Sequence, residues 1–238
     1  MRTERRWAGI DIFRGWAILL MVFFHLSYDL EYFNIINFHI QSNSFFIWFR
    51  FLIVSMFLLT VGMSLKLAHY HTIHWSKVKK RSYALGLSAS LVSVVSFLIF
   101  PSSWIYFGIL HFVFVISILL LPLLKFPYLS LFISIATFIA FHLDFLNMHW
   151  LFNMLVSPLH LPLPFSVDVL RFFPWVSLVL LGMVTISFGW HERIFAYKIW
   201  NRKSQINIFF KYIGENALLI YLLHQPILFG FFLLIKEF

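Results

Sequence analysis

The stretch DIFRGWAILLMVFFHLSYD, Asp11–Asp29, is apolar and long enough to cross a lipid bilayer. Four of its side chains are nevertheless ionisable: Asp11, Arg14, His25 and Asp29. Ionisable groups are costly inside a membrane, so by default they mark a functional site. Asp11 and Arg14 are spaced to share one helix face, and so are His25 and Asp29. Along a helix, about 16 Å separates Arg14 from His25.

The composition of the whole chain is that of a polytopic membrane protein. Of the 238 residues, 61% are hydrophobic and 11% are charged, whereas soluble domains carry roughly 25% charged residues. We expect one all-α domain, residues 1–238, folded as a transmembrane helix bundle of about seven spans. The expected spans are 10–30, 46–68, 83–100, 104–122, 127–143, 172–190 and 214–235. The first span is too long and too charged for a cleaved signal peptide.

The distribution of Lys and Arg predicts an N-terminus in the cytoplasm and a C-terminus outside. In this orientation nearly all of these residues fall on the cytoplasmic side, and only Arg171 and Lys236 fall opposite, with Arg50 inside the second span. The outer segment 144–171 contains WLFNMLVSPL, which is typical of a short re-entrant or interfacial helix. The basic and aromatic segment 191–212 predicts an amphipathic surface segment.

Several chemistries are excluded or disfavoured by the composition. The chain has no cysteine, which excludes disulfides, thiolate metal sites and cysteine nucleophiles. The net charge of +9 is explained by topology and lipid headgroups, so we expect no nucleic-acid partner. The sequence HYHTIH, His69–His74, resembles a metal-binding cluster, but no acidic residue or cysteine accompanies it. We therefore interpret it as an interfacial loop and expect no metal site.

Three histidines fall inside the expected spans: His25, His111 within FGILH, and His224 within YLLHQP. An interhelical hydrogen bond explains any one of them. Three at similar depth, together with Asp29 and Gln225, instead predict a shared polar cavity. A histidine with a carboxylate helper can act as a general base or as a nucleophile that carries an acyl group.

Arg14 has two interpretations. A salt bridge with Asp11 is the structural one. The functional one is a cation that meets a phosphate-bearing ligand arriving from the cytoplasm. The same ligand would contact a basic inner loop, chiefly Lys79, Lys80 and Arg81.

Five segments carry a family resemblance. They are RGWAILLMVFFHLSYDL (14–30), MFLLTVGMSL (56–65), IYFGILHFVFVIS (105–117), DVLRFFPWVSLVLLGM (168–183) and GENALLIYLLHQPIL (214–228). In this order, over most of the chain, they resemble the bacterial relatives of heparan-alpha-glucosaminide N-acetyltransferase. Arg14 and His25 also fit the Arg-x10-His pattern of the integral-membrane glycan O-acyltransferases.

The resemblance implies an acyltransferase of a bacterial inner membrane. Its donor would be a cytoplasmic acyl-CoA, and acetyl-CoA is the one we expect. Its acceptor would be a sugar amine or hydroxyl of an extracytoplasmic glycan or glycolipid. The other expected partners are membrane lipid and a second copy of the chain in a homodimer. The lysosomal enzyme has a luminal domain that is absent here and an asparagine at the position of His25. Its proposed catalytic histidine lies in the following luminal loop, where this chain has His39.

The expected mechanism places the donor's phosphates against Arg14, which Asp11 accompanies, and against the basic inner loops. His25, held by Asp29, deprotonates the acceptor or takes the acyl group itself. His111 and His224 line the same cavity and stabilise the developing oxyanion. Which histidine is catalytic, and whether nitrogen or oxygen is acylated, is left open.

Two other classes of protein are alternatives. A transporter or flippase for a lipid or small anion explains the intramembrane charges equally well, but it predicts inverted repeats and broken helices, and neither is clear in the sequence. A non-catalytic membrane scaffold leaves the three histidines unexplained.

Overall fold

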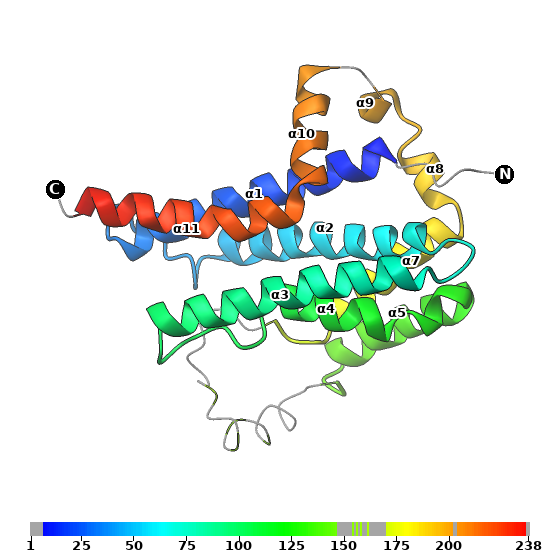
Figure 1. The fold of residues 1–238 in the computed structure, drawn as a ribbon, viewed down its shortest axis with the longest axis horizontal. Coiled ribbons are helices and arrows are strands. Elements are labelled where there is room, and N and C mark those ends of the chain that lie inside the picture. The colour runs from blue at the N-terminus through cyan, green and yellow to red at the C-terminus, as the bar shows by residue number, and fades with distance from the viewer. Residues whose placement is uncertain are drawn as a thin grey trace. The chain divides into compact units, whose positions relative to one another are not determined.

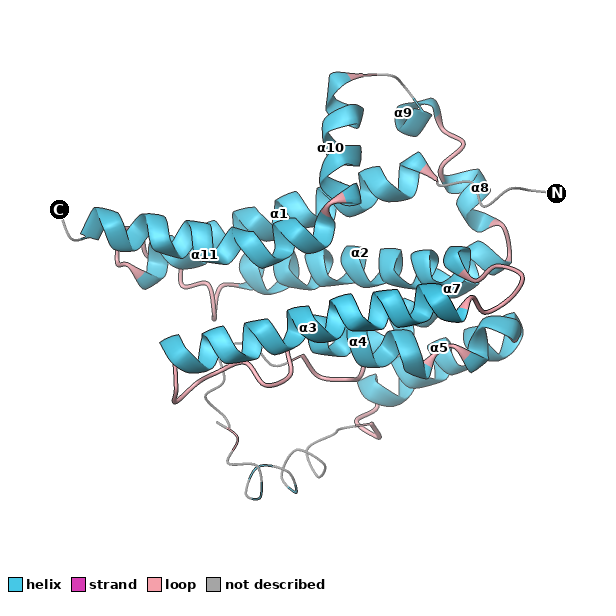
Figure 2. Cartoon of the chain, viewed as in Figure 1, coloured by secondary structure: helices cyan, strands magenta, loops and turns pink. Residues whose placement is uncertain are grey.

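The structure is a computed structural model that describes residues 7–146, 154, 156, 158, 161, 170–201 and 204–236. All regular secondary structure in these residues is helical (Figure 2). The elements are α1 Ala8–Tyr32, α2 Ser44–Ala68, α3 Trp75–Ile99, α4 Ile109–Leu119, the 3-10 helix η1 Pro122–Lys125, α5 Pro127–His142, α7 Trp175–Ser187, α8 Trp190–Ile194, α9 Lys198–Asn201, α10 Gln205–Glu215 and α11 Ala217–Lys236 (Figure 1). The predicted all-α class is confirmed.

Each of the seven expected spans contains an apolar helix, but the helices differ in length. Among the described residues, four helices are long and apolar enough to cross a membrane: α1, α2, α3 and α11. The apolar helices α4, α5 and α7 are shorter, whereas a bilayer core requires about 20 helical residues. The chain is therefore an integral membrane protein by the length and composition of its helices, and the count of seven spans and their orientation stay predictions.

The fourth helix is shorter than its expected span because polar side chains bind the backbone ahead of it. The Ile105 amide donates to Ser96 Oγ at 2.9 Å, and Ser93 Oγ donates to the Ile105 carbonyl at 2.8 Å. These bonds hold the segment before Ile109 out of the helix. Pro122 starts η1 after α4, where a missing N–H is tolerated. The predicted helix in WLFNMLVSPL lies largely outside the described residues.

The chain forms two compact units. Unit 1 comprises residues Met1–Thr60 and Trp190–Phe238, and unit 2 comprises Val61–Gly189. The helix α2 contributes its first part to unit 1 and its last part to unit 2. The interpretation of residues 1–238 as one domain stays a prediction.

In unit 1, α1 packs against both α10 and α11 (Figure 1). Its contact with α10 is close enough to require glycine: a β-carbon on Gly15 would collide with the backbone carbonyl of Phe210, and one on Gly214 with that of Asp11. Ile18 and Ile213 lie in the core beside this crossing. Glycines at such a crossing let two helix backbones approach directly.

The helix α10 begins within the segment 191–212 predicted to be amphipathic and covers its C-terminal part. It starts at the N-cap Ser204, whose hydroxyl accepts from the Asn207 amide at 3.2 Å. Its buried residues, Phe210, Ile213 and Gly214, follow helical spacing, while Lys211 is exposed. The burial pattern agrees with an amphipathic helix.

In unit 2, α3 packs against α4 and α5 packs against α7. Val179 and Leu180 of α7 are fully buried, and a β-carbon on Gly62 of α2 would collide with the Val179 carbonyl. Ser134 Oγ of α5 donates to the Ser177 carbonyl of α7 at 2.7 Å. The buried apolar side chains of α7 thus form the core of this unit.

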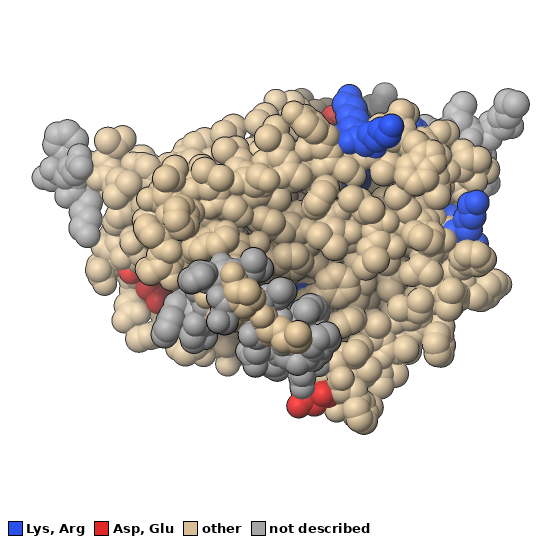
Figure 3. Space-filling view, turned by 60° about the horizontal axis from the view of Figure 1, so that its bottom comes forward, with Lys and Arg blue, Asp and Glu red and all other residues tan. Residues whose placement is uncertain are grey.

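Large apolar side chains are also abundant on the surface. Trp48, Leu98 and Phe132 are each about 70% exposed, at 69%, 72% and 68%. Uncharged residues cover most of the face shown in Figure 3. Extended apolar surface of this kind is a liability for a soluble protein, and it is the surface expected of helices that face lipid.

Candidate active site

Two of the three predicted intramembrane histidines meet in unit 1. The rings of His25 on α1 and His224 on α11 lie with their centroids 4.9 Å apart and their planes at 58°. His224 is buried and His25 is partly buried. The first and last apolar helices of the chain therefore bring two imidazoles together between them.

The hydrogen bond of His224 fixes which of its ring nitrogens carries the proton. Nδ1 lies 2.6 Å from the backbone carbonyl of Tyr221. A carbonyl oxygen can only accept, so Nδ1 is the donor and the neutral ring has its lone pair on Nε2. Nε2 is buried and has no hydrogen-bond partner among the described residues. His224 thus presents an oriented basic nitrogen inside the helix packing.

Asp29 has a different partner from the one expected. The predicted hydrogen bond between His25 and Asp29 is not formed; instead, Gln225 Nε2 of α11 donates to Asp29 Oδ1 at 2.9 Å. Asp29 is fully buried, so its carboxyl group faces the packed neighbour helix rather than its own helix surface. No described residue donates a hydrogen bond to, or accepts one from, the His25 ring. We define these four residues, His25, Asp29, His224 and Gln225, as the α1–α11 polar cluster.

The α1–α11 polar cluster contains several polar atoms without partners. Asp29 Oδ2, His224 Nε2 and Gln225 Oε1 are buried and have no hydrogen-bond partner among the described residues. Buried polar atoms are normally paired, because leaving one unpaired costs about 1–3 kcal/mol. Three such acceptors on neighbouring residues can receive donors from a bound molecule. Pro226, which follows directly inside α11, also removes one backbone hydrogen bond of that helix.

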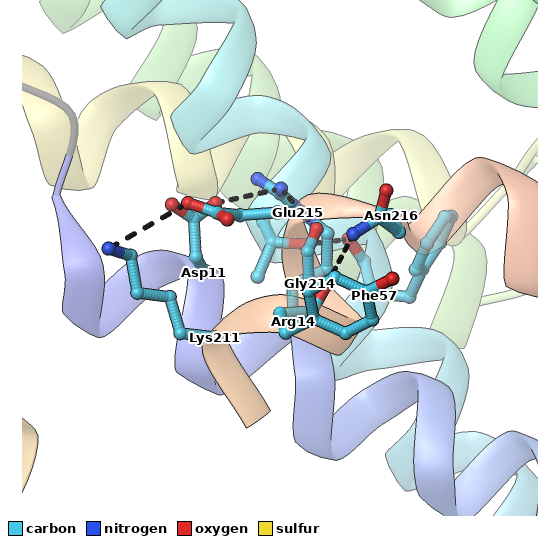
Figure 4. A network of polar contacts seen from close by, with 9 residues as sticks. Asp11, Arg14, Phe57, Lys211, Gly214, Glu215 and Asn216 are labelled. Carbon is cyan, nitrogen blue, oxygen red and sulfur yellow. Dashed lines mark hydrogen bonds and ion pairs between the residues drawn. The ribbon is translucent and has the colours of Figure 1, made fainter. Parts of the chain in front are cut away.

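Arg14 is held by contacts within unit 1. Its Nη1 lies 3.1 Å from Asp11 Oδ1 and donates to the Gly214 carbonyl at 3.0 Å (Figure 4). Its side chain is only 17% exposed. These contacts join α1 to the end of α10 and agree with the structural interpretation of Arg14. A contact with a phosphate stays a prediction.

The third predicted intramembrane histidine, His111, belongs to unit 2, where both of its ring nitrogens have hydrogen-bond partners. Its Nδ1 accepts from the Gly108 amide at 3.3 Å, so Nε2 carries the proton and donates to Ser93 Oγ at 2.9 Å. Ser93 Oγ in turn donates to the Ile105 carbonyl. This chain of hydrogen bonds joins α3 to the start of α4. It is an interhelical hydrogen bond of the kind that explains a single histidine in an apolar helix. The cavity shared with His25 and His224 stays a prediction.

The predicted basic residues of the inner loop lie at the start of α3, in unit 2. Lys79 and Lys80 are exposed, and Arg81 is partly buried. Lys79 and Lys80 thus lie at the surface of their unit, on the side where the charge distribution predicts the cytoplasm.

A polar pocket lies at the opposite end of α1 from Arg14. It has a volume of about 420 Å³ and is lined by Tyr28, Glu31, Tyr32, Asn34, Ile36, Asn37 and Gln41. Glu31 Oε2 accepts from the amides of Phe38 and Ile40 at 3.1 and 3.0 Å, which fixes the connection that follows α1. Sequence reasoning did not identify this pocket, although YDLEY and the amides that follow it supply its donors and acceptors.

In the described residues, the fold and the α1–α11 polar cluster define a helical integral membrane protein in which a partly buried and a buried histidine meet beside a buried carboxyl group. The chain matches the family model of the catalytic domain of heparan-alpha-glucosaminide N-acetyltransferase over residues 6–226, and it belongs to this family. The predicted family is thereby confirmed. No match was found among curated proteins or among solved structures.

Proposed function

We propose that this protein transfers an acyl group from a cytoplasmic acyl-CoA to a sugar amine or hydroxyl on the extracytoplasmic side of a bacterial inner membrane. The acyl group that we expect is acetyl. The observation that carries the proposal is the contact between His25 and His224 inside the apolar helices of a chain of this acetyltransferase family. Acyl transfer requires a base for the acceptor, and imidazole is the side chain most often used for that purpose.

In the proposed step, a nitrogen lone pair of the histidine pair takes the proton of the acceptor N–H or O–H. The acceptor atom attacks the thioester carbonyl, the C–S bond breaks, and the CoA thiolate leaves with the proton from the imidazolium. His224 Nε2 is buried and has no hydrogen-bond partner in the described part of the chain, and the His25 ring lies beside the His224 ring. The alternative keeps the same residues. A His25 nitrogen attacks the thioester carbonyl, the C–S bond breaks and the CoA thiolate leaves; the acceptor then attacks the acyl-imidazole, His25 leaves, and His224 takes the acceptor's proton.

Asp29 and Gln225 act in this proposal as positioning residues. Their hydrogen bond ties α1 to α11 directly beside the two histidines. Asp29 Oδ2 and Gln225 Oε1, to which no described residue donates, are acceptors for donors of the substrate. Substrate amide or hydroxyl groups would satisfy both atoms.

The polar pocket at the end of α1 is the proposed acceptor site. Hydroxyl, amide and carboxylate groups from Tyr28, Glu31 and Asn34 match the many hydroxyls of a sugar. Tyr28 and Glu31 are one turn or less from Asp29 on the same helix. Under the predicted orientation this end of α1 faces the outside, where the acceptor is expected.

The donor is proposed to approach from the opposite end of α1. Its phosphates would meet Arg14, which Asp11 accompanies, and the basic start of α3 at Lys79, Lys80 and Arg81. Along α1, about 16 Å separates Arg14 from His25. This is close to half of the hydrocarbon core, which is roughly 30 Å thick. A pantetheine arm whose phosphates are held at Arg14 would have to enter the membrane by this distance to reach His25.

The proposal is tested with purified protein, acetyl-CoA labelled in the acetyl group, and glucosamine or a membrane glycan fraction as acceptor. Label should appear covalently on the acceptor and free CoA should be released in equal amount. A transporter or flippase would instead move its substrate without changing it. Finding no labelled acceptor with any of these sugars, while the protein remains folded, would contradict the proposal.

A further inference from the structure

A second pocket, in unit 2, has no role in the function proposed so far. It lies where α2 ends, between the turn that leads to α3 and the 3-10 helix η1, and its volume is about 270 Å³. Pockets for drug-sized molecules have volumes of roughly 300–1,000 Å³. This pocket therefore has room for a headgroup-sized part of a ligand. The residues with polar side chains that line it are Lys66, His69, Tyr70, His71, Thr72 and Lys125.

Lys66 gives the pocket a partly buried positive charge. Its Nζ donates to the Leu124 carbonyl at 2.7 Å, and Nζ also lies 5.6 Å from the centroid of the Tyr70 ring. A carbonyl dipole orients the ammonium group but does not cancel its charge. An ammonium group has three N–H donors, so Lys66 retains donors for another acceptor.

His69 adds a donor whose position is fixed. Its Nδ1 accepts from the His74 amide at 3.2 Å, so in the neutral ring the proton is on Nε2. His69 is buried, at 4% exposed, although it lines the pocket. The ring therefore contributes an N–H group, and not a lone pair, to its surroundings.

The remaining polar groups have the same character. Lys125 brings a second ammonium group, and Tyr70, His71 and Thr72 bring hydroxyl and imidazole groups. Among the described residues that line the pocket, none is acidic. Two ammonium groups repel a metal cation and attract an anion.

We infer that this pocket, which we call the Lys66–Lys125 pocket, binds a phosphate group. Phosphate offers several acceptor oxygens and negative charge to the ammonium, imidazole and hydroxyl donors gathered there. Positive-inside reasoning places Lys66 and Lys125 on the cytoplasmic side, where acyl-CoA is made. The bound phosphate group belongs either to acyl-CoA, an assignment that rests on the proposed function, or to the headgroup of an anionic phospholipid.

The test uses the double variant Lys66→Gln/Lys125→Gln in purified full-length protein. Glutamine keeps a donor for the Leu124 carbonyl but removes both charges. The matched control is Lys198→Gln, which removes one charge from an exposed residue of unit 1. Binding of acetyl-CoA is compared with binding of acetyl-pantetheine, which lacks the phosphates, and retention of phosphatidylglycerol after detergent purification is measured by mass spectrometry.

If CoA supplies the phosphate, the double variant binds acetyl-CoA at least tenfold more weakly, acetyl-pantetheine binding is unchanged, and the loss shrinks in high salt. If a lipid supplies it, the double variant loses phosphatidylglycerol that the control retains. Either result supports the pocket. Unchanged acetyl-CoA binding together with unchanged lipid retention overturns it. Acetyl transfer in the wild type is scored separately, so a failure of the pocket and a failure of the proposed function give different results.

Discussion

At the scale of single residues, Asp29 depends on one hydrogen bond. Its fully buried carboxyl group accepts from Gln225, and its other oxygen has no partner among the described residues. Gln225→Leu removes the donor and should lower the free energy of unfolding by about 1–3 kcal/mol. Thermal unfolding in detergent measures the change, with Gln205→Leu at an exposed site as control. Equal melting temperatures for the two variants would show that the bond contributes nothing.

His111 is expected to stabilise the protein rather than to react. Because both of its ring nitrogens are engaged in unit 2, His111→Ala should lower the free energy of unfolding by roughly 1–3 kcal/mol, and Ser93→Ala should act in the same direction. Acetyl transfer per folded molecule should stay near that of the wild type. If the His111→Ala protein is folded but transfers no acetyl group, His111 takes part in the reaction.

These residues also show where sequence reasoning reached its limit. The spacing of His25 and Asp29 predicts a shared helix face, and a shared face permits a hydrogen bond but does not create one. Gln225, on the last helix, provides the donor instead. Likewise, nothing in FGILH reveals that Ser93 lies against His111. Membership of the family was predictable, because it is carried by ordered sequence segments and not by tertiary contacts.

At the scale of the helix, the crossing of α1 and α10 depends on glycine. A β-carbon at Gly15 would overlap the Phe210 carbonyl, a backbone atom that cannot rotate away. Gly15→Ala should therefore separate the helices and lower the thermal midpoint and the yield of folded protein. Gly230→Ala is the matched control, because nothing lies within 4 Å of that position and alanine favours a helix over glycine by roughly 1 kcal/mol. If both variants melt alike, the close crossing does not exist.

The lengths of the helices were less predictable than their existence. Hydropathy identified all seven apolar segments, since each contains a helix. It could not show that Ser93 and Ser96 bind the backbone at Ile105 and delay the start of α4. Side-chain bonds to the backbone compete with helix formation locally, and a hydropathy window does not register them.

At the scale of the whole molecule, the distribution of Lys and Arg predicts that the chain ends lie on opposite sides of the membrane. A reporter fused after Phe238 should be active only outside the cytoplasm, and one fused before Met1 only inside. The measurement is reporter activity in intact cells. Activity of both fusions on the same side would require an even number of spans and would contradict the predicted seven-span topology.

In the proposed reaction, His25 and His224 together perform acyl transfer. Protein reconstituted in vesicles, with labelled acetyl-CoA on one side and the sugar acceptor on the other, tests it most directly. His25→Ala and His224→Ala should each reduce transfer by roughly 10²–10⁴-fold, and the double variant should be little worse, because residues that act as a unit are non-additive. Acetyl-CoA binding should survive in all three variants. Near-normal transfer by the folded double variant would show that the two histidines do not perform the reaction.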